Sequence, residues 1–269
     1  MQTPDALGII AGSGAYPLLV ARAARTAGTR TIAAAAFTGE TDPALAQHVD
    51  SIEWLRVGQL GRLLSFFKAT GVRQAIMAGQ IAPKNLFDVR PDVKTLLLLA
   101  RLKRRNAETI FGAIADELAA IGVELLPATT FLDDSLAHAG LIAGRALSRR
   151  EQDDVAFGFG IAKEVSRLDI GQTVVVNGGT VVAVEAFEGT NDAIKRGGAL
   201  AQKGAVLVKV SKPHQDMRFD VPVIGPQTIE AAAAANVRVI AVEAARTLLL
   251  EKEALAAAAT RRGLSIVGV

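Results

Sequence analysis

The 269-residue chain has no cysteine, which excludes disulfides, thiolate zinc sites and cysteine nucleophiles. Aromatic residues make up only 4% of the sequence, and the formal net charge is +3. A nucleic-acid-binding surface would need a basic stripe with interleaved aromatics, so we expect no nucleic-acid partner. No uncharged apolar run approaches the ~18–20 residues that a membrane-spanning helix requires.

The amino terminus also lacks the basic segment that opens a secretory signal peptide. Together with the missing cysteines, this predicts a soluble, cytoplasmic protein whose contact with a membrane would be peripheral. Half of the residues are hydrophobic, which is enough to build the core of one large domain or of two modest ones.

Residues 7–128 alternate between short apolar strands and amphipathic helices. The strand "LGIIAG" leads into the helix "AYPLLVARAARTAG", and the strand "SIEWLRV" into "GQLGRLLSFFKATG". This alternation is typical of a parallel sheet with helices on both faces. We therefore predict an α/β fold whose residues 1–134 form a Rossmann-like N-terminal domain.

After Pro127 the alternation loosens. Ser148 with Glu151 three residues later has the pattern of a capping box, for a helix that runs to about Leu168. Two β-rich runs flank Asn177-Gly178-Gly179, which is a strong hairpin signal. Hairpins mixed with helices predict a C-terminal α+β domain over residues 135–269.

Gly12-Ser13-Gly14 ends the first predicted strand and opens the first helix. Glycines at this place let a phosphate approach backbone N–H groups at a helix N-terminus. A dinucleotide fingerprint would have a third glycine where Pro17 stands, and an acid where the second strand ends in Ala36-Phe37. We do not expect NAD. A nucleotide or sugar-phosphate site and a tight turn without a ligand both stay open.

The segment "VEAFEGTND", residues 184–192, carries three acids at the end of a predicted strand: Glu185, Glu188 and Asp192. Such acids hold a hard cation through their carboxylate oxygens in some proteins. The alternative is a solvated strand end with an acid-rich helix start, for which Thr190 or Asn191 would be the N-cap.

The segment "KPHQDMRFDVP", residues 212–222, places polar side chains at every second position: Lys212, His214, Asp216, Arg218 and Asp220. One interpretation is an amphipathic edge strand, bracketed by Pro213 and Pro222. The other is a functional site, in which a metal takes the carboxylates and phosphate oxygens take the lysine and arginine. Like charges at two-residue spacing repel on one face of a strand, and this slightly favours the site.

The segment "VKTLLLLARLKRR", residues 93–105, mixes leucines with cations. A basic amphipathic helix of this kind can lie on an anionic membrane. The alternative is a core-packing helix whose last turn carries cations that suit the helix dipole.

The arrangement of these motifs resembles one family, the UDP-2,3-diacylglucosamine pyrophosphatases of lipid A synthesis that lack a metallophosphoesterase signature. The resemblance covers nearly the whole chain. Its most specific parts are "RLDIGQTVVVNGGTVVAVEAFEGT" and "KVSKPHQDMRFDVPVIGPQTI", and it also includes "LGIIAGSGAYP", "MAGQI" and the tail "LSIVGV".

The resemblance implies hydrolysis of the pyrophosphate of UDP-2,3-diacylglucosamine to UMP and 2,3-diacylglucosamine 1-phosphate, in the biosynthesis of lipopolysaccharide. It implies Mg²⁺ or another divalent cation, with water attacking the phosphorus on the sugar side. It also implies a catalytic C-terminal domain, with the ligand in the cleft between the two domains. The expected partners are the lipid-linked UDP-sugar, the inner face of the membrane in transient contact, and a second copy in a homodimer.

The essential aspartate of the family lies in an Arg-x-Asp-x-Pro motif, which matches Arg218, Asp220 and Pro222 here. The resemblance thus assigns Asp220. The full set of expected catalytic residues is Asp220, Asp216, Lys212 and Arg218, with Asp220 and Asp216 as metal ligands. The expected substrate-binding residues are Gly12, Gly14, Gln80, Gln215, Glu185, Glu188, Thr190 and Lys195.

Two positions depart from the family pattern. Relatives carry Asp directly after Glu-Gly-Thr, where this chain has Asn191, with Asp192 next. Relatives also carry paired acids before the helix near Glu108, where this chain reads Asn106-Ala107-Glu108. The missing carboxylate at Ala107 keeps open the alternative of a non-catalytic nucleotide-sugar binding or regulatory protein. A third interpretation is a sugar-nucleotide transferase.

Overall fold

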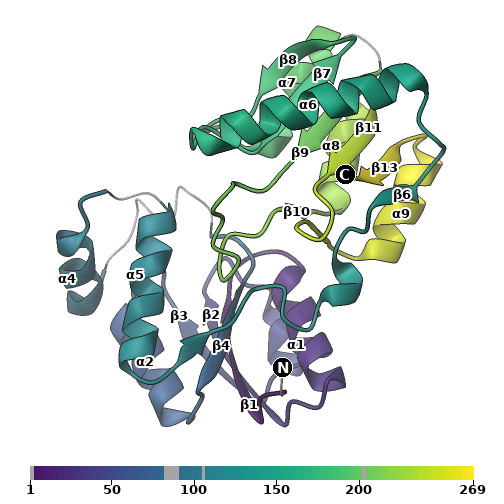
Figure 1. Ribbon diagram of the computed structural model, residues 1–269. Coiled ribbons are helices and arrows are strands. Elements are labelled where there is room, and N and C mark those ends of the chain that lie inside the picture. Colours follow the sequence, from purple (N-terminus) through teal and green to yellow (C-terminus); the bar gives the residue numbers. More distant parts are fainter. Residues whose placement is uncertain (1–2, 82–90, 105–106, 202–203) are drawn as a thin grey trace. The chain divides into compact units, whose positions relative to one another are not determined.

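The computed structural model describes residues 3–81, 91–104, 107–201 and 204–269. The chain divides into two compact units (Figure 1). Unit 1 consists of Met1–Leu132 together with Asp216–Asp220, and unit 2 consists of Asp133–Gln215 together with Val221–Val269. The sequence predicted a single boundary near residue 134. It gave no indication that residues 216–220 group with the first unit.

Unit 1 is built on a five-stranded sheet of order β3-β2-β1-β4-β5, in which all neighbours are parallel. Its strands are β1 (Ala6–Ala11), β2 (Thr31–Phe37), β3 (Ser51–Leu55), β4 (Gln74–Ala78) and β5 (Glu124–Leu125). The strand order reverses between β1 and β4, as in doubly wound sheets. The Rossmann-like prediction is therefore confirmed.

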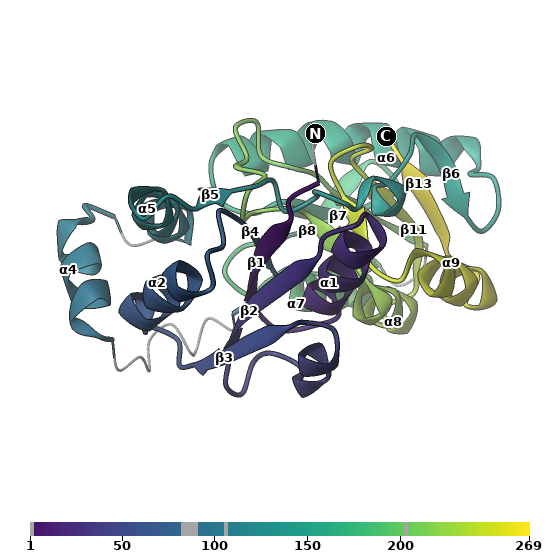
Figure 2. The ribbon, with the colours of Figure 1, turned by 90° about the horizontal axis from the view of Figure 1, so that it is seen from below.

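Helices cover both faces of this sheet (Figure 2). They are α1 (Tyr16–Thr26), α2 (Leu60–Ala69) and α5 (Ala107–Ala120), while α4 (Val93–Arg101) packs against α2 and the 3₁₀ turn η1 (Pro43–Gln47) against α1. Side chains alternate along β1, so Ile10 packs with Phe67 of α2 and Leu118 of α5, while its neighbour Ile9 points to the opposite face. α1 contacts β1 and β4 from that opposite face.

Unit 2 contains a six-stranded mixed sheet of order β6-β13-β11-β9-β7-β8. Its strands are β6 (Gly140–Ala143), β7 (Thr173–Asn177), β8 (Thr180–Val184), β9 (Ala205–Lys209), β11 (Val237–Val242) and β13 (Ser265–Gly268). The central strands β9, β11 and β13 are parallel, and the flanking β6 and β7 are antiparallel to their neighbours. A separate pair is formed by β10 (Val223–Ile224) and β12 (Leu248–Leu249).

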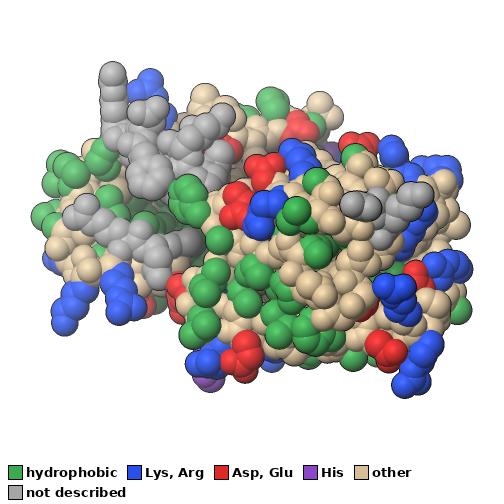
Figure 3. All heavy atoms as spheres, turned by 90° about the horizontal axis from the view of Figure 1, so that it is seen from above, with side chains coloured by type: hydrophobic (Ala, Val, Ile, Leu, Met, Phe, Trp, Pro, Cys, Tyr) green, Lys and Arg blue, Asp and Glu red, His purple; other side chains and the backbone are tan. Residues whose placement is uncertain are grey.

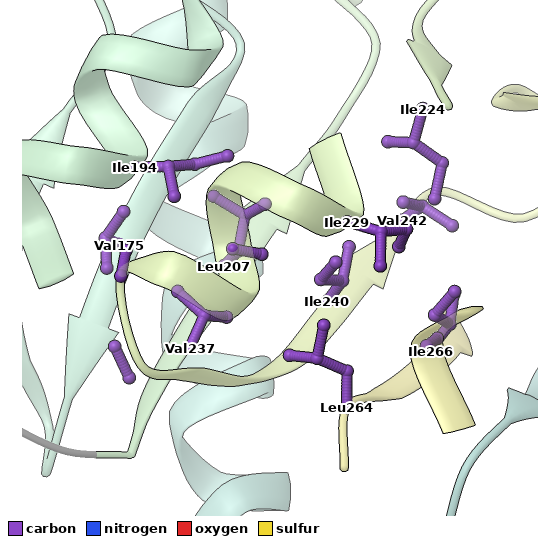
Figure 4. Packing of buried hydrophobic residues seen from close by; sticks show 14 of the residues in the cluster. Val175, Ile194, Leu207, Ile224, Ile229, Val237, Ile240, Val242, Leu264 and Ile266 are labelled. Atoms are coloured by element: carbon purple, nitrogen blue, oxygen red, sulfur yellow. The ribbon is translucent and has the colours of Figure 1, made fainter. Parts of the chain in front are cut away.

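Four helices pack on the two faces of this sheet: α6 (Arg149–Arg167), α7 (Thr190–Ala201), α8 (Pro226–Ala234) and α9 (Lys252–Arg261). A short 3₁₀ turn, η2 (Asp133–Ser135), precedes β6. Figure 4 shows Ile194 of α7 and Ile229 of α8 close to Val175, Leu207 and Ile240 of the strands, and all five are fully buried. On the opposite face, α6 covers the valines of β7 and β9.

The local signals around α6 are confirmed. Ser148 and Glu151 form the capping box. Gly178 and Gly179 both have positive φ, at 59° and 74°, as a two-residue turn between β7 and β8 requires. The buried carboxylate of Asp154, on α6, accepts both of their N–H groups, at 2.8 and 2.6 Å. This aspartate therefore fixes the hairpin turn to the helix.

The edge-strand interpretation of residues 212–222 is wrong. The segment forms turns at residues 213–214 and 217–219 and adds no strand to either sheet. Its polar side chains bond to the local backbone instead: Gln215 accepts the Lys212 N–H at 2.6 Å, and Asp216 accepts the Arg218 N–H at 3.1 Å. Such side-chain bonds compete with a strand ladder, which explains why alternation alone misled.

The predicted helix over residues 93–105 is shorter than expected. α4 begins after the N-cap Asp92, whose carboxylate accepts the Thr95 N–H at 2.8 Å, and it ends at Arg101. Lys103 and Arg104 follow the helix, and Arg105 lies outside the described residues.

No helix within the described ranges is long and apolar enough to cross a bilayer. On the face shown in Figure 3, acidic and basic side chains are interspersed among hydrophobic ones, in keeping with the small net charge.

Candidate active site

The sheet of unit 2 brings several chain segments to one edge. β9 and β11 are parallel and end there together. β7 is antiparallel to β9, so its first residue, Thr173, pairs with Lys209, the last residue of β9. β8 runs back along β7 and returns to the same edge at Val184. Ligands of open α/β sheets bind beyond the carboxyl ends of the parallel strands, so a ligand is expected at this edge.

A pocket of about 220 Å³ lies at this edge. Its lining comes from the loop before β7, the residues after β8, and the end of β9 with the residues beyond it: Asp169, Ile170, Gly171, Gln172, Glu185, Ala186, Lys209 and Lys212. A Cβ on Gly171 would lie only 2.0 Å from the carbonyl oxygen of Glu185. Glycine is therefore required for the loop before β7 to approach the end of β8.

Polar side chains in this pocket are linked in a short chain. The Lys209 ammonium donates to the Thr190 hydroxyl at 2.8 Å, and that hydroxyl donates to Oε1 of Glu185 at 2.6 Å. Of the described residues that line this pocket, Glu185 and Gln172 each have a buried oxygen without a hydrogen-bond partner, Oε2 and Oε1 respectively. Buried polar atoms are normally paired, so these two oxygens mark a place for donors from a ligand or from water.

Lys212 and its neighbours form the polar side of the same edge. The Lys212 ammonium forms an ion pair with the Asp169 carboxylate. Next to it, Glu243 accepts from the Ser211 N–H at 2.7 Å and from the Lys163 ammonium at 3.0 Å. Burial acts to raise the pKa of Glu243, but these hydrogen bonds outweigh it, and the net pKa is lowered.

Two of the expected substrate-binding residues are engaged elsewhere in unit 2. Glu188 forms an ion pair with Arg196 at 2.5 Å, and the Arg196 hydrogen bond lowers the pKa of the glutamate. Lys195 pairs with Asp192 at 2.9 Å on the exposed side of α7. Neither Glu188 nor Lys195 lines the pocket.

In unit 1, the loops after β1 and β4 bond to each other at the point where the strand order reverses. The Gly12 N–H donates to Ala78 O at 2.7 Å, and the Ser13 N–H donates to Gln80 O at 2.7 Å. A Cβ on Gly12 would lie 2.5 Å from Gln80 O, so Gly12 serves this close approach. The amides of Gly12 and Ser13 are thus occupied by the protein. Gly14 differs, because its φ of 84° requires glycine although space around it is open.

Residues 216–220 belong to unit 1. Asp216 and Arg218 form an ion pair, in which Nε of Arg218 donates to Oδ1 at 2.9 Å and Nη2 donates to Oδ2 at 2.6 Å. The Arg218 hydrogen bond lowers the pKa of Asp216. The Asp220 N–H donates to the Asp216 carbonyl at 3.0 Å, which closes the turn. Phe219 anchors it against Phe111, with ring centroids 5.8 Å apart.

Within each unit, the structure groups some of the expected residues. Glu185 and Lys212 line one pocket, and Thr190 is bonded to two of the pocket residues. Asp216, Arg218 and Asp220 share the turn in unit 1, as Gly12 and Gln80 share a pair of loops. Gln215 is buried beneath the Lys212 backbone, and His214 is exposed.

Three pocket residues with polar or charged side chains were not predicted: Lys209, Asp169 and Gln172. Asp169 and Gln172 lie in "RLDIGQ", within the most specific part of the family resemblance, so the signal for them was present. Lys209 ends the apolar run "AVLVK", where a lysine is more often simply solvated.

The described residues contain no group of three or more His, Asp or Glu side chains that could hold a metal ion by themselves. Both carboxylate oxygens of Asp216 are bonded to Arg218, so this aspartate is the partner of an arginine. Asn106 lies outside the described residues, and Glu108 is in the first turn of α5.

Comparison with known proteins adds the following findings. A family model described as the LpxI N-terminal domain matches residues 6–135, and one described as the LpxI C-terminal domain matches residues 138–267. A curated protein of Caulobacter vibrioides, named UDP-2,3-diacylglucosamine pyrophosphatase LpxI, is 31% identical over 274 aligned positions, which cover 98% of this chain and 97% of that protein.

Proposed function

This chain belongs to the LpxI family, and from that premise we propose that it is a UDP-2,3-diacylglucosamine pyrophosphatase of lipid A biosynthesis. The observation that carries the proposal is the end-to-end match, since both family domains are present in order and one relative of that name aligns over 98% of the chain. The products would be UMP and 2,3-diacylglucosamine 1-phosphate.

The reaction is a hydrolysis of a phosphoric anhydride. The oxygen of water forms a bond to the phosphorus on the sugar side, the bond from that phosphorus to the bridging oxygen breaks, and UMP departs with the bridging oxygen. Charge on the two phosphates must be neutralised while this happens. Lys212 and Arg218 are the cations that we assign to this role, and we assign Asp220 to orientation of the attacking water.

A divalent cation, Mg²⁺ in the first place, is the cofactor that we propose. Mg²⁺ usually keeps several waters and takes only one or two carboxylates together with substrate phosphates, so a site without three clustered acids still fits it. Asp220 would hold the ion, and Asp216 would instead position Arg218, to which its carboxylate is bonded. When bound, the ion would supply charge neutralisation at the phosphates.

The proposal is tested by adding UDP-2,3-diacylglucosamine to the purified chain and measuring release of UMP. We expect UMP in stoichiometric amount with the sugar 1-phosphate, loss of release in excess EDTA, and recovery when Mg²⁺ is added back. A chain that binds the substrate and never releases UMP would be a nucleotide-sugar binding protein instead. Full activity in EDTA would contradict only the metal assignment.

Asp220 is the residue whose removal should affect turnover most. Asp220→Ala would remove stabilisation that exists mainly in the transition state, which typically costs about two to three orders of magnitude in kcat, or roughly 3–4 kcal/mol. Substrate affinity and melting temperature should stay close to those of the parent chain. Asp153→Ala, which removes an exposed carboxylate from α6, is the matched control. Near-normal turnover in folded Asp220→Ala would refute the role.

The substrate is an amphiphile, so we also propose a cytoplasmic protein in peripheral contact with the inner membrane. α4 supports this proposal, because Val93, Leu96 and Leu97 expose 72%, 52% and 54% of their surface and Arg101 is exposed nearby. Apolar side chains flanked by cations suit an anionic bilayer surface. The homodimer stays a prediction from the family resemblance.

The membrane contact is tested by co-sedimentation with phosphatidylglycerol vesicles. The double change Leu96→Gln and Leu97→Gln should lower the bound fraction severalfold, because it removes apolar area from the contact. The double change Phe157→Gln and Leu200→Gln, at exposed positions of α6 and α7, is the control and should bind as the parent does. A parent chain that does not sediment, or a control that loses as much binding, would refute the contact.

A further inference from the structure

The pocket at the edge of the second sheet combines two kinds of recognition group. It contains two cations, Lys209 and Lys212, of which Lys212 forms an ion pair with Asp169, another residue of the lining. It also contains two buried acceptors that no described residue satisfies, Oε2 of Glu185 and Oε1 of Gln172. A simple inorganic anion would leave the acceptors unpaired, and a metal ion would sit against two ammonium groups. The chemistry that satisfies both sides is an anion attached to a group with N–H or O–H donors.

Lys209 is built to hold the anion. It lies at the end of β9 and is only partly exposed, and within the described ranges it makes no direct ion pair with an acid. Thr190 takes one of its three donors and fixes the ammonium in place. A partly buried ammonium without a direct counter-ion is costly unless an anion binds beside it.

Thr190 also couples the two sides of the pocket. Its hydroxyl accepts from Lys209 and donates to Oε1 of Glu185 at 2.6 Å, so the second oxygen of that carboxylate cannot turn toward Thr190 as well. Gly171 keeps the opposite wall close, because no side chain fits between it and the Glu185 backbone. The Glu185 carboxylate is therefore held in position before any ligand arrives.

We propose that this pocket binds a phosphorylated sugar ring, with Lys209 and Lys212 on the phosphate and with Glu185 and Gln172 accepting from ring donors. The inference rests on the proposed function and deepens it, because both halves of the substrate carry such a group. The 2,3-diacylglucosamine half provides a glucosamine 1-phosphate, and the UMP half provides a ribose phosphate.

The test is calorimetric titration of the full-length chain with three probes: inorganic phosphate, glucosamine 1-phosphate and UMP. Lys209→Met should weaken both inorganic phosphate and one of the two sugar phosphates by about tenfold or more, since a charge-assisted hydrogen bond is lost. Arg149→Met removes one positive charge from an exposed position of the same unit and is the control. Melting temperatures of all variants show that they are folded.

Glu185→Gln separates the two sides of the pocket. Its amide oxygen can still accept from Thr190, but an N–H₂ group replaces the acceptor Oε2. Binding of the sugar phosphate should fall about tenfold, while binding of inorganic phosphate should stay within twofold of the parent value. Which of glucosamine 1-phosphate and UMP responds identifies the half of the substrate that the pocket holds.

The inference is overturned if the parent chain binds neither sugar phosphate, or if Lys209→Met binds all three probes as the Arg149→Met control does. An equal loss of all probes in Glu185→Gln would also overturn the assignment of ring donors. Failure of the proposed function is distinguishable, because it would appear as absent UMP release from a chain whose probe binding still depends on Lys209. Normal UMP release with unchanged binding and kinetics in Lys209→Met would refute the pocket alone.

Discussion

The antiparallel pairing of β7 with β9 is the constraint on which the candidate site depends. Because Thr173 lies opposite Lys209, the loop that enters β7 meets the end of β9 at one edge of the sheet. A parallel β7 would put that loop at the other edge and leave Lys209 with neither Glu185 nor Gln172 nearby. Gly171 adds the second requirement, since the loop reaches Glu185 only where a side chain is absent. Topology and one glycine together create a charged pocket from segments far apart in the sequence.

In unit 1, the residues at the carboxyl ends of the parallel strands β1 and β4 bond to each other. Its strand order has the reversal at which doubly wound folds bind nucleotides, yet the loops after β1 and β4 donate their amides to each other there. This agrees with the incomplete glycine fingerprint, in which Pro17 replaces the third glycine. Residues 216–220 of the same unit are held by the Asp216–Arg218 ion pair and by the contact of Phe219 with Phe111.

The sequence predicted the features that are determined by residues close together in the chain. It did not predict the contacts that depend on which strands are neighbours in the sheet. Short sequence patterns predicted three features correctly: the parallel sheet of unit 1, the Ser148–Glu151 capping box and the hairpin at Gly178-Gly179. The alternation in residues 212–222 misled, because Asp216 and Gln215 bond to nearby N–H groups and make turns. Lys209 was missed because its neighbours in the sequence do not distinguish a lysine in a binding pocket at the end of a buried strand from a solvated lysine. Glu185 and Thr190 were expected near a ligand. The bonds of Thr190 to Glu185 and to Lys209 depend on neighbouring strands, and the sequence does not show which strands are neighbours.

The most direct measurement of the central claim is hydrolysis of UDP-2,3-diacylglucosamine in ¹⁸O-labelled water, followed by mass spectrometry of both products. If the chain is a pyrophosphatase that directs water to the phosphorus on the sugar side, one ¹⁸O atom will appear in the 2,3-diacylglucosamine 1-phosphate and none in UMP. Label in UMP would contradict the assigned direction of attack, and two unlabelled products or no products would contradict enzymatic hydrolysis itself.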